Sequence, residues 1–291
     1  MNSKLEIRNN KSSADSVESA MWQTIRELAP TIPTPRLDAE VLVMHVCDIG
    51  RSELITGGQS ALTDDQGHRL RELSDKRKQG VPVAYLTGVR EFWSLEFNIS
   101  PATLIPRPET ELLVEKALAH IPQDAEWTVA DLGTGCGAIA LTLAKERPRS
   151  RIIATDISPA ALEVARSNAA KFGLTNVEFR EGSWCEPLIG MKLDMMVSNP
   201  PYVRANDPHL EQGDVRFEPV QALAAGPDGL DAIRHIALSA REHLNPAARL
   251  FFEHGWDQAA AIGQLLHQLG YRNIVCYPDL GGQDRITACH L

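Results

Sequence analysis

The chain has 291 residues, of which 43% are hydrophobic, so it can form one large domain or two smaller ones with substantial cores. Its formal net charge of -9 gives no broad electrostatic footprint for duplex nucleic acid and favours protein or small-molecule partners, while leaving room for a local basic patch. Five spaced cysteines without a CxxC pair indicate neither a disulfide framework nor a metal site: Cys47, Cys136, Cys185, Cys276 and Cys289.

No targeting or membrane segment is recognisable in the sequence. The opening residues, MNSKLEIRNN, lack the apolar core of a signal peptide. Nowhere does a charge-free apolar run reach the length that a bilayer requires. We therefore expect a cytoplasmic protein in a reducing compartment, without a membrane partner.

Residues 1–88 are expected to form a small helical domain. Apolar residues recur at helical spacing in two segments, one on each side of the break PTIPTP. The stretch TDDQ at 63–66 fits a capping box, which opens a further helix that ends near Gly80. The two apolar stripes are Val17, Met21, Ile25 and Leu28, and then Leu37, Val41 and Met44.

Residues 89–108 are expected to be a β-hairpin and a linker between two domains. Alternation of Trp93, Leu95, Phe97 and Ile99 with polar residues indicates a strand with one solvated face. The following LIPRPETELL contains two prolines that restrict the backbone before a new helical pattern begins. A rigid linker and helix cap explain the glutamates of this stretch, Glu109 and Glu111, better than catalysis does.

Residues 109–291 are expected to form a Rossmann-like α/β domain with a doubly wound, mostly parallel sheet. The connection PDLGGQD between the last two strands is too short for a helical crossover, so those strands should be antiparallel. Seven short apolar segments are the expected strands, and one of them is antiparallel: TVADL, RIIATD, NVEFR, LDMMVS, RLFFEH, NIVCY and RITACH.

A glycine-rich loop follows the first of these strands. The stretch DLGTGCGA, residues 131–138, lies between an expected strand and helix, where glycine permits a tight turn and close approach of a ligand. Because it fits both GxGxG and the looser GxGxxG/A pattern, the loop alone does not choose a cofactor. The candidate ligand-binding residues are Gly133, Thr134, Gly135, Cys136 and Gly137.

Asp156 closes the second strand, 19 residues after Gly137, where a carboxylate can accept hydrogen bonds from both hydroxyls of a ribose. A helix cap is the alternative, but Ser158 suits that position better. Ser183 and Trp184 follow the third strand, and the indole could flank an adenine or simply pack in the core. Together these residues indicate a cofactor that contains a nucleoside.

The stretch SNPPYV, residues 198–203, ends the fourth strand, so Asn199 should emerge at the ligand-binding edge of the sheet. Pro200 and Pro201 make a stiff turn because each has a locked φ and no N–H group. The Asn199 side-chain oxygen and the Pro200 carbonyl could accept the two hydrogens of a planar NH2 group, on which Tyr202 could stack. The matching electrophile is the cationic methyl donor S-adenosylmethionine, whose carboxylate suits the helix N-terminus after the glycine loop.

The stretches DLGTGCGAIAL, SNPPYV, QGDVRFEP, FFEHGW and LIPRPETE together resemble the family of protein-(glutamine) methyltransferases that modify peptide-chain release factors. The resemblance covers most of the chain and is strongest from about Tyr85 onward. It implies methylation of the side-chain amide nitrogen of the glutamine in a release-factor Gly-Gly-Gln motif, which supports translation termination. The helical domain is then expected to help recognise the release factor.

The resemblance also implies roles for individual residues. Residues Gly133 to Gly137, Asp156, Trp184 and Asn199 would bind S-adenosylmethionine. Asn199, Pro200, Pro201 and Tyr202 would form the glutamine pocket, with Asn199, Pro200 and Tyr202 closest to catalysis. No role follows for Arg107, Arg216 or Glu253, and a monomer is expected.

Three other functions fit parts of the sequence. An adenine-amine methyltransferase of DNA or RNA could use the same turn, but the acidic balance offers no obvious basic groove. A nicotinamide dehydrogenase would give Asn199 to Tyr202 no task. An adaptor with a relic cofactor site is the non-enzymatic alternative. GGQ also occurs in this chain at 57–59 and 281–283, where we expect turns and not self-methylation.

Overall fold

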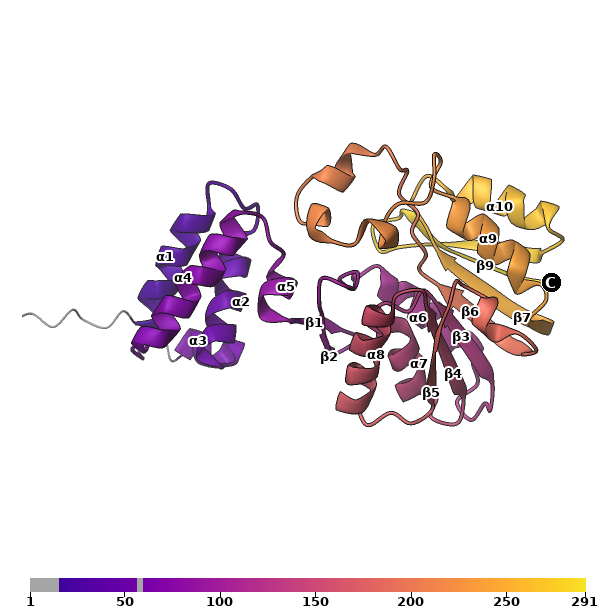
Figure 1. Cartoon of the computed structure of the whole chain (residues 1–291), viewed down its shortest axis with the longest axis horizontal. Coiled ribbons are helices and arrows are strands. Elements are labelled where there is room, and N and C mark those ends of the chain that lie inside the picture. The colour runs from indigo at the N-terminus through magenta and orange to yellow at the C-terminus, as the bar shows by residue number, and fades with distance from the viewer. Residues whose placement is uncertain (1–15, 57–59) are drawn as a thin grey trace, which may run out of the picture. The chain divides into compact units, whose positions relative to one another are not determined.

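The chain is divided into two units between Thr87 and Gly88 (Figure 1). The computed structural model describes residues 16–56 and 60–291. The opening residues, expected to lack a signal peptide, and the first GGQ, residues 57–59, lie outside them. Within the described ranges no helix is both long and apolar enough to cross a bilayer.

The first unit consists of helices around an apolar core that includes Leu42, Leu70 and Leu73. The expected capping box is present, because Gln66 N donates to Thr63 Oγ1 at 3.2 Å and Thr63 N donates to Gln66 Oε1 at 2.9 Å. The helices are α1 (Val17–Leu28), α2 (Pro35–Cys47), α3 (Arg51–Thr56), α4 (Asp64–Lys78) and α5 (Val83–Thr87).

The buried face of α2 differs from the predicted stripe. Leu37 is 53% exposed, whereas the buried residues include Leu42 and Val43. A buried ion pair, Arg77 Nε to Asp38 Oδ2 at 2.6 Å, fixes this face against α4. Apolar residues occur all around α2, so its sequence period does not select one face, and the buried face includes the acidic residue Asp38.

The hairpin exists and burial alternates from Trp93 to Ile99 as predicted, but the second strand is shorter than the predicted segment. Strands β1 (Val89–Phe92) and β2 (Leu95–Asn98) are antiparallel, and Trp93 and Ser94 form the turn between them. Their φ values of 54° and 56° are typical of a two-residue type I′ turn. Trp93 N donates to Glu111 Oε1 at 2.8 Å, so Glu111 has a structural partner. Glu109 is the N-cap residue of the helix Thr110–His120, but its side chain makes no capping hydrogen bond, so the expected helix cap is absent at this residue.

The second unit is built on a seven-stranded sheet with strand order β5-β4-β3-β6-β7-β9-β8. Strand β9 is antiparallel to both of its neighbours, and the other adjacent strands are parallel, as predicted. The strands are β3 (Thr128–Leu132), β4 (Arg151–Asp156), β5 (Val177–Glu181), β6 (Leu193–Ser198), β7 (Leu244–Glu253), β8 (Arg272–Pro278) and β9 (Asp284–His290). The second GGQ lies in the turn between β8 and β9, as expected.

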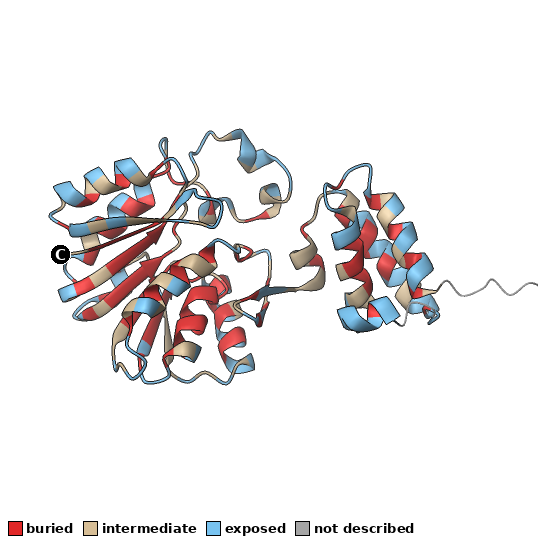
Figure 2. Ribbon diagram, turned by 180° about the vertical axis from the view of Figure 1, so that it is seen from behind, coloured by how far each residue is buried: buried red, intermediate tan, exposed pale blue. Residues whose placement is uncertain are grey.

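Helices cover both faces of this sheet. The first group, α6 (Thr110–His120), α7 (Ala138–Glu146) and α8 (Pro159–Lys171), lies on one face, and α9 (Asp231–Ala240) and α10 (Ala259–Gln268) lie on the other (Figure 1). Buried residues are concentrated along the central strands and on the helix surfaces that face them (Figure 2). The sheet is therefore apolar on both faces, as a doubly wound fold requires.

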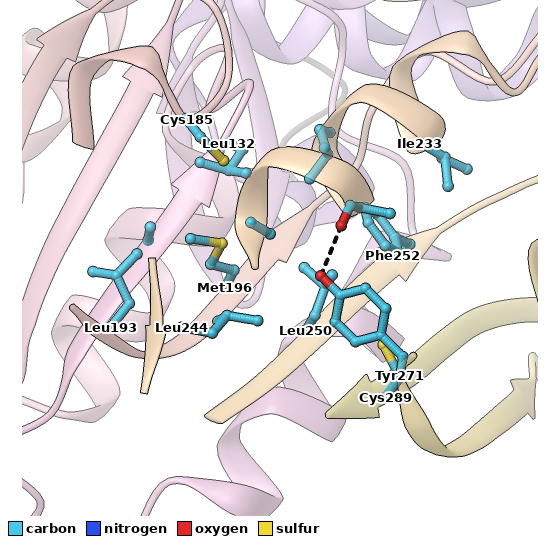
Figure 3. Packing of buried hydrophobic residues seen from close by; sticks show 14 of the residues in the cluster. Leu132, Cys185, Leu193, Met196, Ile233, Leu244, Leu250, Phe252, Tyr271 and Cys289 are labelled. Carbon is cyan, nitrogen blue, oxygen red and sulfur yellow. Dashed lines mark hydrogen bonds between the residues drawn. The ribbon is translucent and has the colours of Figure 1, made fainter. Parts of the chain in front are cut away.

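The core under α9 and α10 joins residues from β3, β6 and β7, including Leu132, Met196 and Phe252 (Figure 3). Tyr271, between α10 and β8, is also buried there, and its hydroxyl donates to Ala237 O at 2.8 Å (Figure 3). This bond satisfies the one polar atom that the tyrosine ring brings into an apolar core.

Strands β3 and β6 are neighbours at the point where the strand order reverses direction. Their carboxyl ends are tied together because Ser198 Oγ donates to Leu132 O at 2.7 Å. Ligands of open α/β sheets bind at this kind of switch point. The glycine loop after β3 and the Asn199 turn after β6 are thus brought to one edge.

Asn168, a buried residue of α8, joins three segments that are distant in sequence. Its Oδ1 accepts from Asn98 N at 2.7 Å, and its Nδ2 donates to Asn98 O at 3.0 Å and to Cys136 O at 2.9 Å. The hairpin and the glycine loop are therefore held by one amide side chain.

We expect Asn168→Ala to lower the free energy of unfolding by about 1–3 kcal/mol, because it leaves buried backbone groups without partners. Urea denaturation followed by circular dichroism measures this change. The control is Ser167→Ala, at an exposed neighbouring position, for which less than about 0.5 kcal/mol is expected. Equal stability of both variants and the wild type would contradict the role given to Asn168.

Candidate active site

A cavity of about 630 Å³ opens at the carboxyl edge of the sheet, within the second unit. Most of the predicted site residues line it, and so do Thr110 of α6 and Arg107 before it. Gly137, Pro200 and Tyr202 do not line its wall. The predicted residues along the wall are Gly133, Thr134, Gly135, Cys136, Asp156, Trp184, Asn199 and Pro201.

The glycine loop is held against the end of β4. Gly133 N and Thr134 N both donate to Thr155 O at 2.9 Å. A Cβ atom at Gly133 would lie 3.1 Å from the Trp184 ring, whereas one at Gly135 would meet no atom within 4 Å. Gly133 is therefore needed for packing, and Gly135, with φ of 57°, leaves open space on the cavity side.

Asp156 stands at the end of β4 with both carboxylate oxygens engaged by the backbone. Oδ2 accepts from Gly135 N and Oδ1 from Ser158 N, each at 2.9 Å. Burial raises the pKa of Asp156, and these N–H donors oppose that effect. Ser158 is the N-cap of α8, as expected, so Asp156 keeps its remaining lone pairs for a ligand.

Trp184 combines the two alternatives that the sequence left open. Its ring packs against Gly133 and the apolar core, and the residue also lines the cavity. The backbone at Trp184 has a φ of 48° and its carbonyl accepts from Thr155 Oγ1 at 3.1 Å. The indole is thus fixed in the wall.

Asp131 is a buried acid that the sequence analysis treated only as the start of the glycine loop. Its Oδ2 accepts from Thr134 Oγ1 at 2.7 Å and from Ala140 N at 3.1 Å. Burial raises the pKa of Asp131 to about 7. The carboxyl group therefore joins the loop to the first turn of α7, a role that its place just before the glycines could have indicated.

Asn199 lies at the opposite side of the same edge, directly after β6. Its Nδ2 donates to Thr110 Oγ1 at 3.1 Å. The amide oxygen, Oδ1, is consequently the atom of this side chain that is left to accept from a ligand. Thr110 was missed by the sequence analysis, because it is one ordinary residue in the PRPET stretch and no spacing marks it.

Tyr202 directs its hydroxyl toward a buried acid. The hydroxyl donates to Glu253 Oε1 at 3.3 Å, and burial raises the pKa of Tyr202 well above its usual value. Glu253 ends β7 and is only 1% exposed. The predicted stacking of the Tyr202 ring on a substrate stays a prediction.

The residue that follows the Pro200-Pro201 turn is hydrogen-bonded to Gln258, the N-cap residue of α10. Gln258 Nε2 donates to Tyr202 O at 2.9 Å, and Gln258 Oε1 accepts from Gly255 N at 2.8 Å. Pro200 is buried and Pro201 lines the cavity. A stiff turn with a fixed end therefore presents Asn199.

Residues 204–229 supply another wall of the cavity and contain three short 3₁₀ helices (Figure 1): η2 (Pro208–Glu211), η3 (Val215–Phe217) and η4 (Val220–Ala222). Glu218 is buried here, accepts from Ile105 N at 3.0 Å and forms an ion pair with Arg107. Arg107 lines the cavity and joins this segment to the linker before α6. The guanidinium carbon of Arg216 lies 5.0 Å from the centre of the Phe217 ring.

The residues of the cavity fit S-adenosylmethionine. Asp156 offers acceptors for ribose hydroxyls and Trp184 offers an apolar wall. Gly135 has no side chain, so the cavity space beside it is open to a ligand. Asn199 supplies a hydrogen-bond acceptor on the other side of the same cavity. The arrangement can orient a flat NH2 group beside a nucleoside-containing cofactor.

Comparison with known proteins gives two family matches along the chain. A model described as PrmC N-terminal domain matches residues 19–88, and one described as Methyltransferase small domain matches residues 109–215. The release factor glutamine methyltransferase of Xylella fastidiosa (strain Temecula1) is 50% identical over 259 residues, which is 89% of this chain and 94% of that protein.

Solved structures with low identity support the fold. A methyltransferase from Pyrococcus furiosus has a TM-score of 0.52 at 16% identity, over 78% of this chain and 98% of that one. The 16S rRNA N2 G1207 methyltransferase of T. thermophilus, in complex with AdoMet and guanosine, has a TM-score of 0.53 at 16% identity, over 69% of this chain and 49% of that one.

The predicted fold and the predicted class, an S-adenosylmethionine-dependent methyltransferase, are confirmed. The Xylella fastidiosa protein shares half of the aligned residues, and the alignment covers most of both chains. The chain belongs to the release factor glutamine methyltransferase family.

Proposed function

We propose that this protein methylates the side-chain amide nitrogen of the glutamine in the Gly-Gly-Gln motif of a peptide-chain release factor. The proposal is supported above all by Asn199, whose amide nitrogen is engaged by Thr110 so that its oxygen is left for a ligand in the cavity. Relatives that cover the chain carry this activity in their names.

Two acceptors are assigned to the two hydrogens of the substrate amide. These are Asn199 Oδ1 and the Pro200 carbonyl, which follow one another on the stiff turn. The cofactor, when bound, supplies an electrophilic methyl group. Asn199 and Pro200 hold the amide nitrogen in place and stabilise the positive charge that develops on it, while Tyr202 is assigned to contact its flat face.

The other cavity residues are assigned to cofactor binding. Asp156 accepts from the ribose, Trp184 flanks the adenine, and the loop from Gly133 to Gly137 approaches the methionine part. The helical first unit is assigned to recognition of the release factor. We also propose that the protein acts as a monomer in the cytoplasm and requires no direct contact with nucleic acid.

Mass spectrometry of a purified release factor, after reaction with this protein and isotope-labelled S-adenosylmethionine, tests the proposal. We expect one labelled methyl group on the glutamine of the Gly-Gly-Gln motif. Labelling of duplex DNA in a parallel reaction, without labelling of the release factor, would assign the protein to adenine-amine methylation instead.

Asn199→Ala is expected to reduce kcat by about 10²–10³-fold, the usual effect of losing one prepositioned polar group at a developing charge. Binding of S-adenosylhomocysteine, measured by calorimetry, should change much less. Asn245→Ala is the matched control, since Asn245 Nδ2 donates to Asp194 Oδ1 at 2.8 Å and neither residue lines the cavity. Turnover of Asn199→Ala equal to the wild type would contradict the assignment.

Asp156→Ala is expected to weaken S-adenosylhomocysteine binding by about 10–100-fold, because hydrogen bonds to a charged acceptor contribute about 1.5–3 kcal/mol. Calorimetry measures this change directly. The matched control is Glu181→Ala, which removes an exposed carboxylate from the register partner of Asp156 on β5. Equal weakening by both substitutions would point to a general charge effect and not to a ribose contact.

A further inference from the structure

Gln258 is a buried glutamine to which the proposed function gives no task. It is 5% exposed, and it is not among the described residues that line the cavity. Both ends of its amide are engaged, because Nε2 donates to Tyr202 O at 2.9 Å and Oε1 accepts from Gly255 N at 2.8 Å. Gln258 can therefore affect the reaction only through the backbone groups that it binds.

These two partners fix the orientation of the Gln258 amide. A backbone N–H group can only donate and a backbone carbonyl can only accept, so Oε1 must face Gly255 and Nε2 must face Tyr202. Nε2 also lies 3.4 Å from the carbonyl oxygens of Asp228 and Gly229. The shortest of its three bonds is the one to Tyr202.

Gly229 lies against the same carbonyl group. A Cβ atom at this position would be 2.3 Å from Tyr202 O and 2.7 Å from Gln258 Nε2, closer than real Cβ atoms approach. Gly229 also has a φ of 76°, which glycine adopts without strain. The bond between Gln258 and Tyr202 therefore depends on the absence of a side chain at Gly229.

The position of the Tyr202 carbonyl bears on Asn199 because only two prolines separate these residues. Each proline has a locked φ, so the turn has few dihedral angles that can change. Its first end is fixed at Ser198, whose hydroxyl donates to the last carbonyl of β3 at 2.7 Å. Fixing the second end at Tyr202 leaves Asn199 and the Pro200 carbonyl little freedom to move.

We infer that Gln258 is a positioning residue for methyl transfer, which holds the Tyr202 carbonyl and thereby sets the place of Asn199 Oδ1 and the Pro200 carbonyl. The inference rests on the proposed function, which assigns these two acceptors to the substrate amide. It gives Gln258 no contact with the substrate or the cofactor.

The first test replaces Gln258 in two ways. Gln258→Met has a similar length and no donor, whereas Gln258→Glu keeps an acceptor for Gly255 N and, when ionised, has no hydrogen for Tyr202 O. We expect kcat to fall by about 10–100-fold in both, the cost of a slightly misplaced reacting group. In the control Gln264→Met, at an exposed position of α10, kcat should stay within about 2-fold of the wild type. Normal kcat in Gln258→Met would overturn the inference.

The second test displaces the Tyr202 carbonyl from the other side, with Gly229→Ala. Gly190→Ala is the matched control, because Gly190 has a φ of 77° and a Cβ atom there would meet no atom within 4 Å. Both variants carry the same backbone strain, and only Gly229→Ala adds the clash. We expect kcat to fall by about 10–100-fold in Gly229→Ala and to stay within about 2-fold in Gly190→Ala. Equal kcat in the two variants would contradict the role of the Tyr202 carbonyl.

A third comparison separates positioning from loss of stability. Tyr271→Phe removes a buried hydroxyl that donates to Ala237 O at 2.8 Å, in the core under α9 and α10. Its thermal unfolding midpoint should fall by about 2–4 °C, while kcat at 25 °C stays within about 2-fold of the wild type. A loss of kcat in Tyr271→Phe as large as that in Gln258→Met, at an equal midpoint, would show a structural role and overturn the inference.

Cofactor binding separates the substrate turn from the rest of the cavity. Calorimetry with S-adenosylhomocysteine should show an affinity for Gln258→Met within about 3-fold of the wild type, because no group assigned to the cofactor is removed. Loss of affinity as large as the loss of kcat would place the effect in the cofactor site and contradict the inference.

A readout without activity is the side-chain NH2 signal of Asn199 in a nitrogen-15 correlation spectrum, identified by its loss in Asn199→Ala. We expect this signal to shift in Gln258→Met and Gly229→Ala and to keep its wild-type position in Gln264→Met and Gly190→Ala. An unchanged signal in Gln258→Met would overturn the inference.

The proposed function and the inference fail in different ways. A wild-type protein that does not methylate release factor refutes the proposed function, and the Asn199 signal still tests whether Gln258 positions this residue. Normal wild-type methylation together with normal kcat in Gln258→Met refutes only the inference.

Discussion

The site depends on one adjacency, that of the carboxyl ends of β3 and β6. The Ser198 hydroxyl bound to the Leu132 carbonyl ties these ends together at the point where the strand order reverses. The glycine loop continues from one strand and Asn199 from the other. The glycine loop and Asn199 therefore line one cavity.

Buried polar groups join the separate segments of this sheet edge by hydrogen bonds and an ion pair. Asn168 holds the glycine loop to the hairpin, and Gln258 holds the end of the proline turn. Glu218 joins Arg107 to the segment that forms another wall. Such groups cost free energy when buried, and only nearly complete hydrogen bonding offsets that cost.

Asp131 and Glu253 are exceptions, since each keeps one oxygen without a partner in the described part of the chain. Both have a pKa raised by burial to about 7. Perturbed acids of this kind are concentrated at functional sites because the fold tolerates their cost only where it is useful. Asp131 is bonded to Thr134 of the glycine loop and Glu253 to Tyr202 of the turn that presents Asn199, so each acid lies behind a segment that forms the cavity wall.

Local physical chemistry made much of the fold readable from the sequence. Strand periodicity, glycine spacing and the short PDLGGQD connection predicted the doubly wound sheet, and β3, β4 and β6 match the predicted segments. A continuous motif such as DLGTGCGA or SNPPYV also carries its own backbone geometry. The misplaced features were the hairpin turn at Trp93 and the buried face of α2, where alternation or apolar content fits more than one arrangement.

The sequence by itself determined which residues end the strands and therefore which ones meet at the sheet edge. It could not identify the partners of those residues, because Thr110 and Asn199, or Tyr202 and Glu253, are far apart in the chain and no local pattern joins them. Only the tertiary structure decided that an ordinary threonine is bonded to the asparagine and a buried glutamate to the tyrosine. Strand ends follow from local sequence, whereas hydrogen-bond partners across a cavity depend on how distant elements pack.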